Sequence, residues 1–343
     1  MKGLVKTQAG FGHLALQEQT IAALGDDEIK IKVHYAGVCG TDIHTYEGHY
    51  NVNYPVTLGH EFAGEIVELG NNVEGFNIGD RVTSETTYYI CGQCQYCATG
   101  DYNLCSKRRG LGTQQDGALA PFVIARAASV HRLPANVTYQ AAAMTEPLAC
   151  AHHAVAKIDV KKGDKAVIMG PGPIGLLVAQ VVKSKGAEII ITGLDNDQAR
   201  LDKAAALQLD HVVNLQHTNL QQYTDDLTSG YGVDIVIECS GAVPAANQGL
   251  SLLRKKGSFV QLGIFKDDKI EFDMDKVIQK EITVVGSRSQ KPADWEPSLQ
   301  LLSDGSVNAE TLVTKILNIS EWDTAYQHIK SGEGIKVLLK PVE

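Results

Sequence analysis

The amino-acid sequence predicts an α/β protein in which a β-rich domain is followed by a doubly wound parallel sheet. Its 343 residues exceed one average domain, so two domains are expected. The first part contains short strand-like runs between Gly and Asn turns, whereas strand and helix patterns alternate from about residue 147. Alternating units of this length imply a parallel sheet with helices on both faces.

In the first part, alternating apolar and polar residues predict strands over residues 28–33, 62–69 and 81–84. Turns such as Gly70-Asn71-Asn72 separate these runs. The chain starts directly with a strand-like pattern and has no signal-peptide core, so a cytoplasmic location is expected.

In the second part, strands alternate with helices. The expected strands cover residues 165–169, 188–192, 234–238 and 257–262, and the expected helices cover residues 149–157, 174–185, 199–207 and 245–253. The remaining residues contain a strand over 281–286, a helix over 297–303 and a strand over 335–339. We therefore expect one domain over residues 1–147, a second over 148–287, and a return of residues 288–343 to the first.

The composition is that of an ordinary globular enzyme, with 44% hydrophobic and 21% charged residues. A net charge of −9 argues against nucleic acid as a partner, because phosphate binding needs a basic surface. No stretch approaches the ~18 apolar residues of a membrane span, so no membrane partner is expected. Seven cysteines in a cytoplasmic chain favour metal ligands or buried thiols over disulfides.

Four cysteines, Cys91, Cys94, Cys97 and Cys105, fall within fifteen residues. Two-residue gaps let successive thiolates turn inward on a tight loop, and four sulfurs fill the tetrahedral shell of Zn²⁺. This pattern predicts a structural zinc in a lobe at about residues 88–110. A zinc ribbon that binds nucleic acid is the competing interpretation, supported by Lys107-Arg108-Arg109 and opposed by the acidic total charge.

A second set of candidate ligands is dispersed along the chain. Cys39 follows a predicted strand, His60 and Glu61 open another, and Glu146 lies where the sequence pattern changes. A cysteine, a histidine and a carboxylate suit a catalytic zinc that keeps one position open. Such a zinc lowers the pKa of a substrate hydroxyl and favours the alkoxide that expels hydride.

Two further residues in the same loop fit a proton path. Thr41 offers a hydroxyl and His44 an imidazole, a group that ordinarily titrates near neutral pH. Taken singly, a buried cysteine, a histidine or a glutamate before proline is more typical of core packing or a helix start. Only their combination indicates a catalytic site.

A third motif is the turn Gly170-Pro171-Gly172-Pro173-Ile174-Gly175, which follows a predicted strand and opens a predicted helix. This context is typical of a dinucleotide-binding turn, whose glycines let backbone N–H groups approach the pyrophosphate. Asp195 lies at the distance expected for the acid that binds the adenosine ribose, which favours NAD. If Leu194 takes the ribose position instead, Arg200 could tolerate NADP.

Together these motifs resemble the medium-chain dehydrogenase/reductase superfamily, in its zinc-containing branch with sorbitol and threonine dehydrogenases. The resemblance covers the whole chain in order. It rests on Gly37-Val38-Cys39-Gly40-Thr41-Asp42, Gly59-His60-Glu61-Phe62-Ala63-Gly64, the four cysteines, Glu146-Pro147-Leu148, the glycine turn and Gly334-Ile335-Lys336-Val337. It implies a GroES-like first domain, a Rossmann second domain, an active site between them and a homodimer or homotetramer.

The resemblance also implies roles for single residues. Cys39 and His60 correspond to ligands of the catalytic zinc, and Glu61 and Glu146 to carboxylates that complete its shell or exchange with water. Arg288 resembles an arginine that contacts substrate oxygens in the polyol enzymes. The residues resembling loop ends that line the dinucleotide are Ser240, Leu262 and Gly263.

The predicted function is hydride transfer from a secondary alcohol, of a polyol or sugar alcohol, to NAD with one catalytic and one structural zinc. An amino-alcohol enzyme of the threonine type, a vicinal-diol enzyme and a sugar-phosphate dehydrogenase are the alternatives within the family. A zinc-free quinone or enoyl reductase is disfavoured because both candidate zinc sites are intact. A non-catalytic protein that binds zinc and nucleotide is disfavoured because it needs no proton path through Thr41 and His44.

Overall fold

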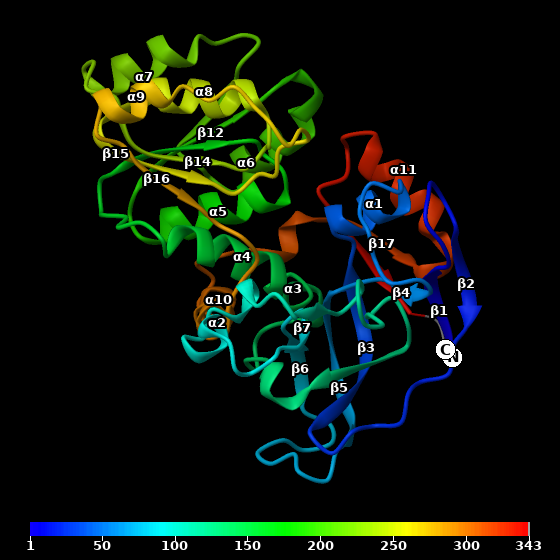
Figure 1. Ribbon diagram of the computed structural model, residues 1–343. Helices are drawn as coiled ribbons and strands as arrows, with labels where there is room; N and C mark the ends of the chain where they lie inside the picture. The colour runs from blue at the N-terminus through cyan, green and yellow to red at the C-terminus, as the bar shows by residue number, and fades with distance from the viewer. Residues whose placement is uncertain (342–343) are drawn as a thin grey trace. The chain divides into compact units, whose positions relative to one another are not determined.

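The computed structural model describes residues 1–341, which divide into two compact units (Figure 1). Unit 1 comprises Met1–Ala149, Gln290–Asp304 and the residues from Ala309 on, and unit 2 comprises Cys150–Ser289 and Gly305–Asn308. The chain passes from unit 1 to unit 2 within helix α4 (Thr145–Val155). In the described part of the chain, no helix has the length and apolar character needed to cross a membrane.

Unit 1 is built mainly of antiparallel strands in two larger sheets. A three-stranded sheet has the order β2 (Leu14–Glu18), β1 (Lys2–Lys6), β4 (Val56–Thr57). A seven-stranded sheet has the order β10 (Val130–Arg132), β6 (Arg81–Ser84), β5 (Glu61–Leu69), β3 (Glu28–Gly37), β18 (Lys336–Lys340), β17 (Val313–Asn318), and β9 (Phe122–Arg126) also pairs with β3. β18 thus brings a late segment of the chain next to β3.

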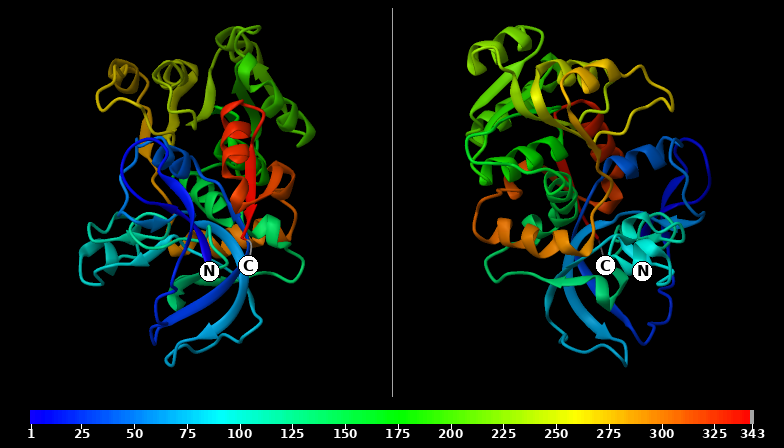
Figure 2. Two further views of the ribbon diagram at one scale, coloured as in Figure 1. Left: turned by 90° about the vertical axis from the view of Figure 1, so that its right-hand side faces the viewer. Right: turned by 60° about the vertical axis from the view of Figure 1, so that its left-hand side comes forward.

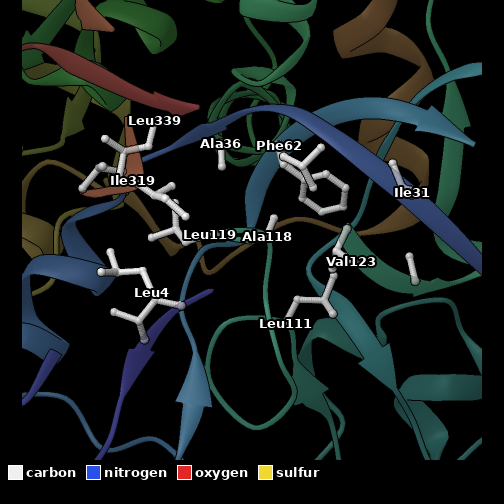
Figure 3. Packing of buried hydrophobic residues seen from close by; sticks show 14 of the residues in the cluster. Leu4, Ile31, Ala36, Phe62, Leu111, Ala118, Leu119, Val123, Ile319 and Leu339 are labelled. Carbon is white, nitrogen blue, oxygen red and sulfur yellow. The ribbon is translucent and has the colours of Figure 1, made fainter. Parts of the chain in front are cut away.

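The central pair β3 and β5 shows why this sheet curves. The two strands are antiparallel, and their register shifts between Lys30 and Ile31 and between Val33 and Tyr35. Such irregularities bend a strand and increase its twist, and Figure 2 shows both strands as long curved ribbons. The apolar side chains on the inner face, among them Ile31 and Phe62, are fully buried and pack with Leu119 (Figure 3).

Short helices complete unit 1. They are α1 (Gly40–Tyr46), α2 (Gln95–Ala98), α3 (Tyr139–Ala142), α10 (Trp295–Ser303) and α11 (Trp322–Lys330). A two-stranded sheet of β7 (Thr87–Tyr89) and β8 (Arg109–Gly110) flanks the segment that carries the four clustered cysteines. The candidate ligand Cys39 lies two residues after the end of β3, and His60 directly precedes β5.

Unit 2 contains one six-stranded sheet in which every pairing is parallel. Its order is β13 (His211–Asn214), β12 (Glu188–Gly193), β11 (Lys165–Met169), β14 (Val233–Glu238), β15 (Leu253–Gln261), β16 (Thr283–Gly286). Numbered along the chain from β11, this is the order 3-2-1-4-5-6 of a Rossmann fold, which places a switch point beside β11.

Helices cover the unit 2 sheet. They are α5 (Pro173–Ser184), α6 (Gln198–Ala206), α7 (Leu220–Thr228), α8 (Val243–Leu252) and α9 (Met274–Gln279). In Figure 1, α7 and α8 lie on one face of the sheet and α5 on the other. The strands β11, β12 and β14 are almost wholly buried, as expected for a parallel sheet covered on both faces.

Several element boundaries differ from the sequence-based expectations, among them the starts of α4, β15 and β16. α4 starts at Thr145 rather than at 149, so Glu146 lies in its first turn. β15 starts at Leu253 rather than at 257, directly after α8. β16 starts at Thr283 rather than at 281, because Glu281 has a left-handed backbone conformation with φ 51° that interrupts a strand.

Candidate active site and metal centres

The loop between β3 and α1 positions the first candidate ligand, Cys39. Cys39 is the N-cap residue of α1 and has an extended backbone conformation. Its backbone N–H donates to Asp42 Oδ2 at 2.9 Å, so the carboxylate three residues on closes the loop from inside the helix. The side chain of Asp42 is 1% exposed, and this buried carboxylate fixes the backbone that presents Cys39.

The same carboxylate connects Cys39 to the segment that carries His60. Asp42 Oδ1 accepts from the Gly59 N–H at 3.3 Å and lies 4.0 Å from His60 Nδ1. Gly59 has φ 91°, and a Cβ at this position would lie 2.8 Å from the Leu119 backbone nitrogen, so a side chain would not fit. His60 is buried, and its Nδ1 has no hydrogen-bond partner among the described residues.

Glu61 is the first residue of β5 and is paired with Gly37 of β3. A Cβ on Gly37 would lie 2.4 Å from Glu61 Oε2, so the missing side chain makes room for this carboxylate. Lys336 of β18 donates from Nζ to Glu61 Oε2 at 2.5 Å and to the Val38 carbonyl at 3.1 Å. Both charged side chains are almost completely buried, at 4% and 1% exposure.

The electrostatics of this buried pair favour the charged form of Lys336. Burial alone would lower the pKa of Lys336, but the Coulombic attraction of Glu61 and Cys39 raises it above the ordinary lysine value. Removing one partner of such a pair strands the other charge in a low-dielectric site. The role of Lys336 could not be predicted from sequence, because its partners are Val38 and Glu61, 298 and 275 residues away.

Glu146 is the second buried carboxylate. Gln290 donates from Nε2 to Glu146 Oε1 at 3.2 Å and to Thr86 Oγ1 at 3.1 Å. The pKa of Glu146 is raised to about 7, because burial disfavours the carboxylate, the attraction of His60 offsets this effect only in part, and Glu61 adds repulsion. Gln290 is itself buried, and sequence analysis did not identify it.

The arrangement of these side chains fits a metal ion. Ligand atoms of Cys39, His60 and Glu61 all lie within 4.8 Å of one another, whereas Glu146 is not part of that group. The buried Nδ1 of His60, which has no partner among the described residues, and the Glu61 carboxylate, for which Gly37 leaves room, are features that fit a bound cation. A thiolate, an imidazole and a carboxylate form a three-ligand zinc set that leaves one position for substrate or water.

Thr41 lies beside this group, with its Oγ1 at 3.7 Å from Cys39 Sγ. His44, three residues further along α1, has a side chain that is 62% exposed. The helix therefore runs from the candidate metal ligands towards solvent at His44. Arg288 follows β16 in unit 2 and is exposed, so its role towards a substrate stays a prediction.

The four clustered cysteines converge within unit 1. The sulfur–sulfur distances are 3.9 Å for Cys91–Cys97, 3.5 Å for Cys94–Cys97 and 3.7 Å for Cys105–Cys91. Four sulfurs bound at ~2.3 Å to a tetrahedral zinc lie roughly 3.8 Å apart. These distances therefore fit a tetrahedral metal site and are far too long for disulfide bonds.

The pKa values of two of these thiols also indicate that a cation is needed to stabilise the cluster as thiolates. Hydrogen bonds from the backbone N–H groups of Gln93 and Cys94 lower the pKa of Cys91 to about 6. Burial and the hydrogen bond with Cys94 raise the pKa of Cys97 to about 12. The protein alone therefore does not stabilise four adjacent thiolates, which a zinc ion would do.

In unit 2, the turn after β11 has the features of a pyrophosphate site. Gly170 has φ 97° and forms the tight turn, and nothing lies within 4 Å of the Cβ position of Gly172, where a ligand can approach. A Cβ on Gly175 would lie 1.9 Å from the Gly170 carbonyl, so this helix packs closely against the turn. Pro173 is the first residue of α5, followed by Ile174, and the helix N-terminus faces the turn.

The neighbouring strand ends are organised by one buried carboxylate, Glu238 at the end of β14. Glu238 Oε1 accepts from the Ser240 N–H at 2.7 Å, and Oε2 accepts from Gln261 Nε2 at 2.7 Å. The N–H groups of Leu262 and Gly263 both donate to the Glu238 carbonyl at 2.9 Å. The three predicted loop-end residues thus lie around Glu238, which sequence analysis did not assign.

Asp195 lies two residues beyond the end of β12. Its Oδ1 accepts from Asn214 Nδ2 at 2.8 Å and lies 2.8 Å from His217 Nε2. Arg200 pairs with Asp197 at 3.0 Å. The strand itself ends at Gly193, whose Cβ position lies 2.8 Å from Pro171, so no larger residue fits there.

Comparison with known proteins identifies related families for both units. Residues 25–135 match the alcohol dehydrogenase GroES-like domain, and residues 173–304 match the zinc-binding dehydrogenase family. The sorbitol dehydrogenase of Halalkalibacterium halodurans is 63% identical over 343 residues, which are 100% of both chains. The D-arabitol-phosphate dehydrogenase of Enterococcus avium is 45% identical over 99% of this chain and 97% of its own.

Solved structures agree with this relationship. The 2R,3R-butanediol dehydrogenase from Bacillus subtilis superposes with a TM-score of 0.90 at 29% identity, covering 99% of each chain. The alcohol dehydrogenase TADH from Thermus sp. ATN1 superposes with a TM-score of 0.91 at 26% identity, covering 100% of each chain. The predicted combination of a GroES-like and a Rossmann fold is confirmed.

Proposed function

Because this chain belongs to the zinc-containing medium-chain dehydrogenases, in the polyol dehydrogenase branch, we propose that it oxidises a secondary alcohol of a polyol with NAD as hydride acceptor. The observation that carries the proposal is the convergence of Cys39, His60 and Glu61 within 4.8 Å in a buried site. The catalytic domain then comprises residues 1–147 with the return of 288–343, and the nucleotide domain comprises residues 148–287.

In this proposal, Cys39 and His60 hold a catalytic zinc, which when bound acts as a Lewis acid and lowers the pKa of the substrate hydroxyl. Glu61, and Glu146 by exchange, complete the shell. Asp42 orients the two fixed ligands through the Cys39 and Gly59 N–H groups.

The proton of the substrate hydroxyl leaves through the side chains of α1. Thr41 accepts it at Oγ1, next to Cys39, and passes its own proton outward to the exposed imidazole of His44, which releases it to solvent. The four cysteines Cys91, Cys94, Cys97 and Cys105 hold a second, structural zinc, because four sulfurs leave no position for a substrate.

The substrate is proposed to be a sugar alcohol, since the relative at 63% identity is named a sorbitol dehydrogenase. Arg288 is the proposed contact to substrate oxygens. A sugar-alcohol phosphate is the second candidate, supported by the D-arabitol-phosphate dehydrogenase at 45% identity. A panel of polyols, polyol phosphates, threonine and vicinal diols, followed by the absorbance of reduced nicotinamide, distinguishes them; activity confined to threonine or to the phosphates would contradict the first proposal.

The proposed nucleotide is NAD, because the Asp195 carboxylate would repel a 2′-phosphate. Asp195→Ala should narrow the preference for NAD over NADP, measured as the ratio of the two dissociation constants by titration. In the alternative, Leu194 takes the position beside the ribose and Arg200 tolerates NADP. A wild-type enzyme that binds NADP more tightly than NAD would show that Asp195 does not face the ribose.

The proposed assembly is a homodimer or homotetramer. β16 pairs only with β15 among the described strands, and its Val284 is 41% exposed, so this sheet edge is available to a second copy. Light scattering at micromolar concentration should give a multiple of 37.0 kDa. A monomeric mass would refute the proposal.

A further inference from the structure

A third group of metal-ligating side chains lies at the end of α1, apart from the four cysteines and from Cys39, His60 and Glu61. Ligand atoms of His44, Glu47 and His49 all lie within 4.8 Å of one another. The distances from Glu47 Oε2 are 3.8 Å to His44 Nδ1 and 3.6 Å to His49 Nδ1. Two imidazoles and a carboxylate form a ligand set that binds zinc in proteins.

The backbone holds the two histidines together. His49 N–H donates to the His44 carbonyl at 2.8 Å, and Tyr50 N–H donates to the same carbonyl at 3.2 Å. Gly48 makes this turn with φ 80°, and a Cβ there would lie 2.8 Å from the Gly10 backbone. The turn that returns the chain to His44 therefore requires glycine and is packed against the N-terminal loop.

The Glu47 carboxylate is oriented by two side chains of α11. Glu47 Oε1 accepts from Lys330 Nζ at 2.9 Å and from the Tyr326 hydroxyl at 3.1 Å. These contacts turn Oε2 towards the two imidazoles, in the way that outer hydrogen bonds orient a metal-ligating carboxylate. The positive charge of Lys330 weakens cation binding, so this site should be weaker than the four-cysteine site.

The distances fit a zinc ion after a small adjustment. Nitrogen and oxygen ligands at ~2.0–2.1 Å from a tetrahedral zinc lie about 3.4 Å apart, which is about 0.2–0.4 Å less than the separations from Glu47 Oε2. At 3.6–3.8 Å these pairs are too long for hydrogen bonds. The side chains of His44 and His49 are 62% and 72% exposed, so an ion reaches them from solvent.

We propose that His44, Glu47 and His49 form a third site for a divalent transition-metal ion, and that zinc bound there inhibits the enzyme by occupying the His44 imidazole. The inhibitory part rests on the proposed function, in which His44 releases the proton. The binding part does not, because it depends only on the three side chains. Zinc in excess of the two resident ions should therefore be a reversible inhibitor that acts through this surface cluster.

The test uses the enzyme purified with its resident zinc. Equilibrium dialysis against zinc sulfate should show one additional ion per chain, and the rate of polyol oxidation should fall over the same range of free zinc and recover on dilution. His49→Ala should weaken binding of the additional ion by roughly tenfold or more, since a ligand is lost, and should leave the rate without added zinc unchanged. His13→Asn is the matched control, because His13 is an exposed histidine outside the clusters found among the described residues.

Each outcome decides a part of the proposal. An additional ion that binds equally well to His49→Ala overturns the third site. An ion that is lost in His49→Ala but does not slow the wild-type enzyme supports the site and overturns the role of His44 in proton release. An enzyme without any dehydrogenase activity that still binds the His49-dependent ion contradicts the proposed function and leaves the site standing.

Discussion

The proposed structural and catalytic zinc sites of unit 1 are built in opposite ways. The four cysteines lie within one short segment, and N–H groups of the same loop stabilise the Cys91 thiolate. Cys39 and His60 come from different segments and are oriented by the buried Asp42, while Lys336 anchors Glu61 from another part of the chain. A site whose four ligands all come from the protein can be built from one short segment. The site that keeps a position for substrate depends instead on buried charged residues, Asp42 and Lys336, from separate segments of the chain.

The largest effect on turnover is expected for His60→Ala. Loss of this imidazole removes a proposed ligand of the catalytic zinc, so the rate should fall by roughly a thousandfold or more. The zinc content should drop by one ion per chain while the four-cysteine ion remains. His34→Ala, which alters a histidine stacked on Tyr139, should keep both ions and its activity. Full activity in zinc-depleted enzyme would contradict the scheme.

A smaller effect is expected for His44→Ala, because this residue is proposed to move a proton and not to hold the catalytic zinc. General-base assistance is typically worth ~10²–10⁴, and buffer replaces part of it, so a loss of about ten- to a thousandfold is expected. The pH–rate profile should change shape, and added imidazole should restore part of the rate. An unchanged profile would show that the proton takes another path. His49→Ala serves as the neighbouring control.

Gln290→Ala tests the support of Glu146. Removing the amide deletes the hydrogen bond to Glu146 Oε1, and the loss of such an outer partner typically costs ~10–100-fold in activity or metal affinity. Gln290→Glu should lower activity or metal affinity further, because it places a second carboxylate beside Glu146. The absorption spectrum of the cobalt-substituted enzyme should shift in both variants. An unchanged spectrum and rate would assign Gln290 to packing alone.

Cys94→Ser should have the smallest effect on turnover and the largest on stability. Loss of the structural zinc is expected to cost about 3 kcal/mol or more, which corresponds to a lower Tm by roughly 6–12 °C. The folded fraction should retain its catalytic zinc and a rate per molecule close to that of the parent. Cys150→Ser is the control for a cysteine outside the cluster. Normal thermal stability with two bound ions would contradict a structural role.

The features predicted from sequence are those encoded by nearby residues. The spacing of Cys91 to Cys105 and the turn around Gly170 are local patterns with direct physical causes, so the metal lobe and the Rossmann unit were foreseeable. The helix α11 was not predicted, because most of its residues are polar and only Trp322 and Ala325 are buried, which is too few for a clear helical pattern of apolar residues. The start of α4 was misplaced because the prediction rested on the Ala-rich run from residue 149, although a glutamate before proline, as at Glu146, is typical of a helix start.

The supporting residues of the candidate site could not be predicted for a different reason. Lys336, Gln290 and Glu238 are ordinary polar residues in sequence, and their significance comes from burial beside a partner. For Lys336 and Gln290, that partner is far away in the chain. Asp42 was closer to detection, since an acid three residues after a helix N-cap is a recognisable pattern. Its second role, at Gly59, required the tertiary structure.

The place of β18 between β3 and β17 has a consequence for how the protein is made. During synthesis, β3 and β5 leave the ribosome long before β18, and the whole parallel sheet of unit 2 is translated in between. Until β18 arrives, the buried Glu61 lacks its ammonium partner, and Ala36 and Gly37 at the end of β3 lack their neighbouring strand. Unit 2 has a contiguous sheet and can form first, so the metal-binding unit, although it begins earlier in the chain, is expected to be the last to reach its native state.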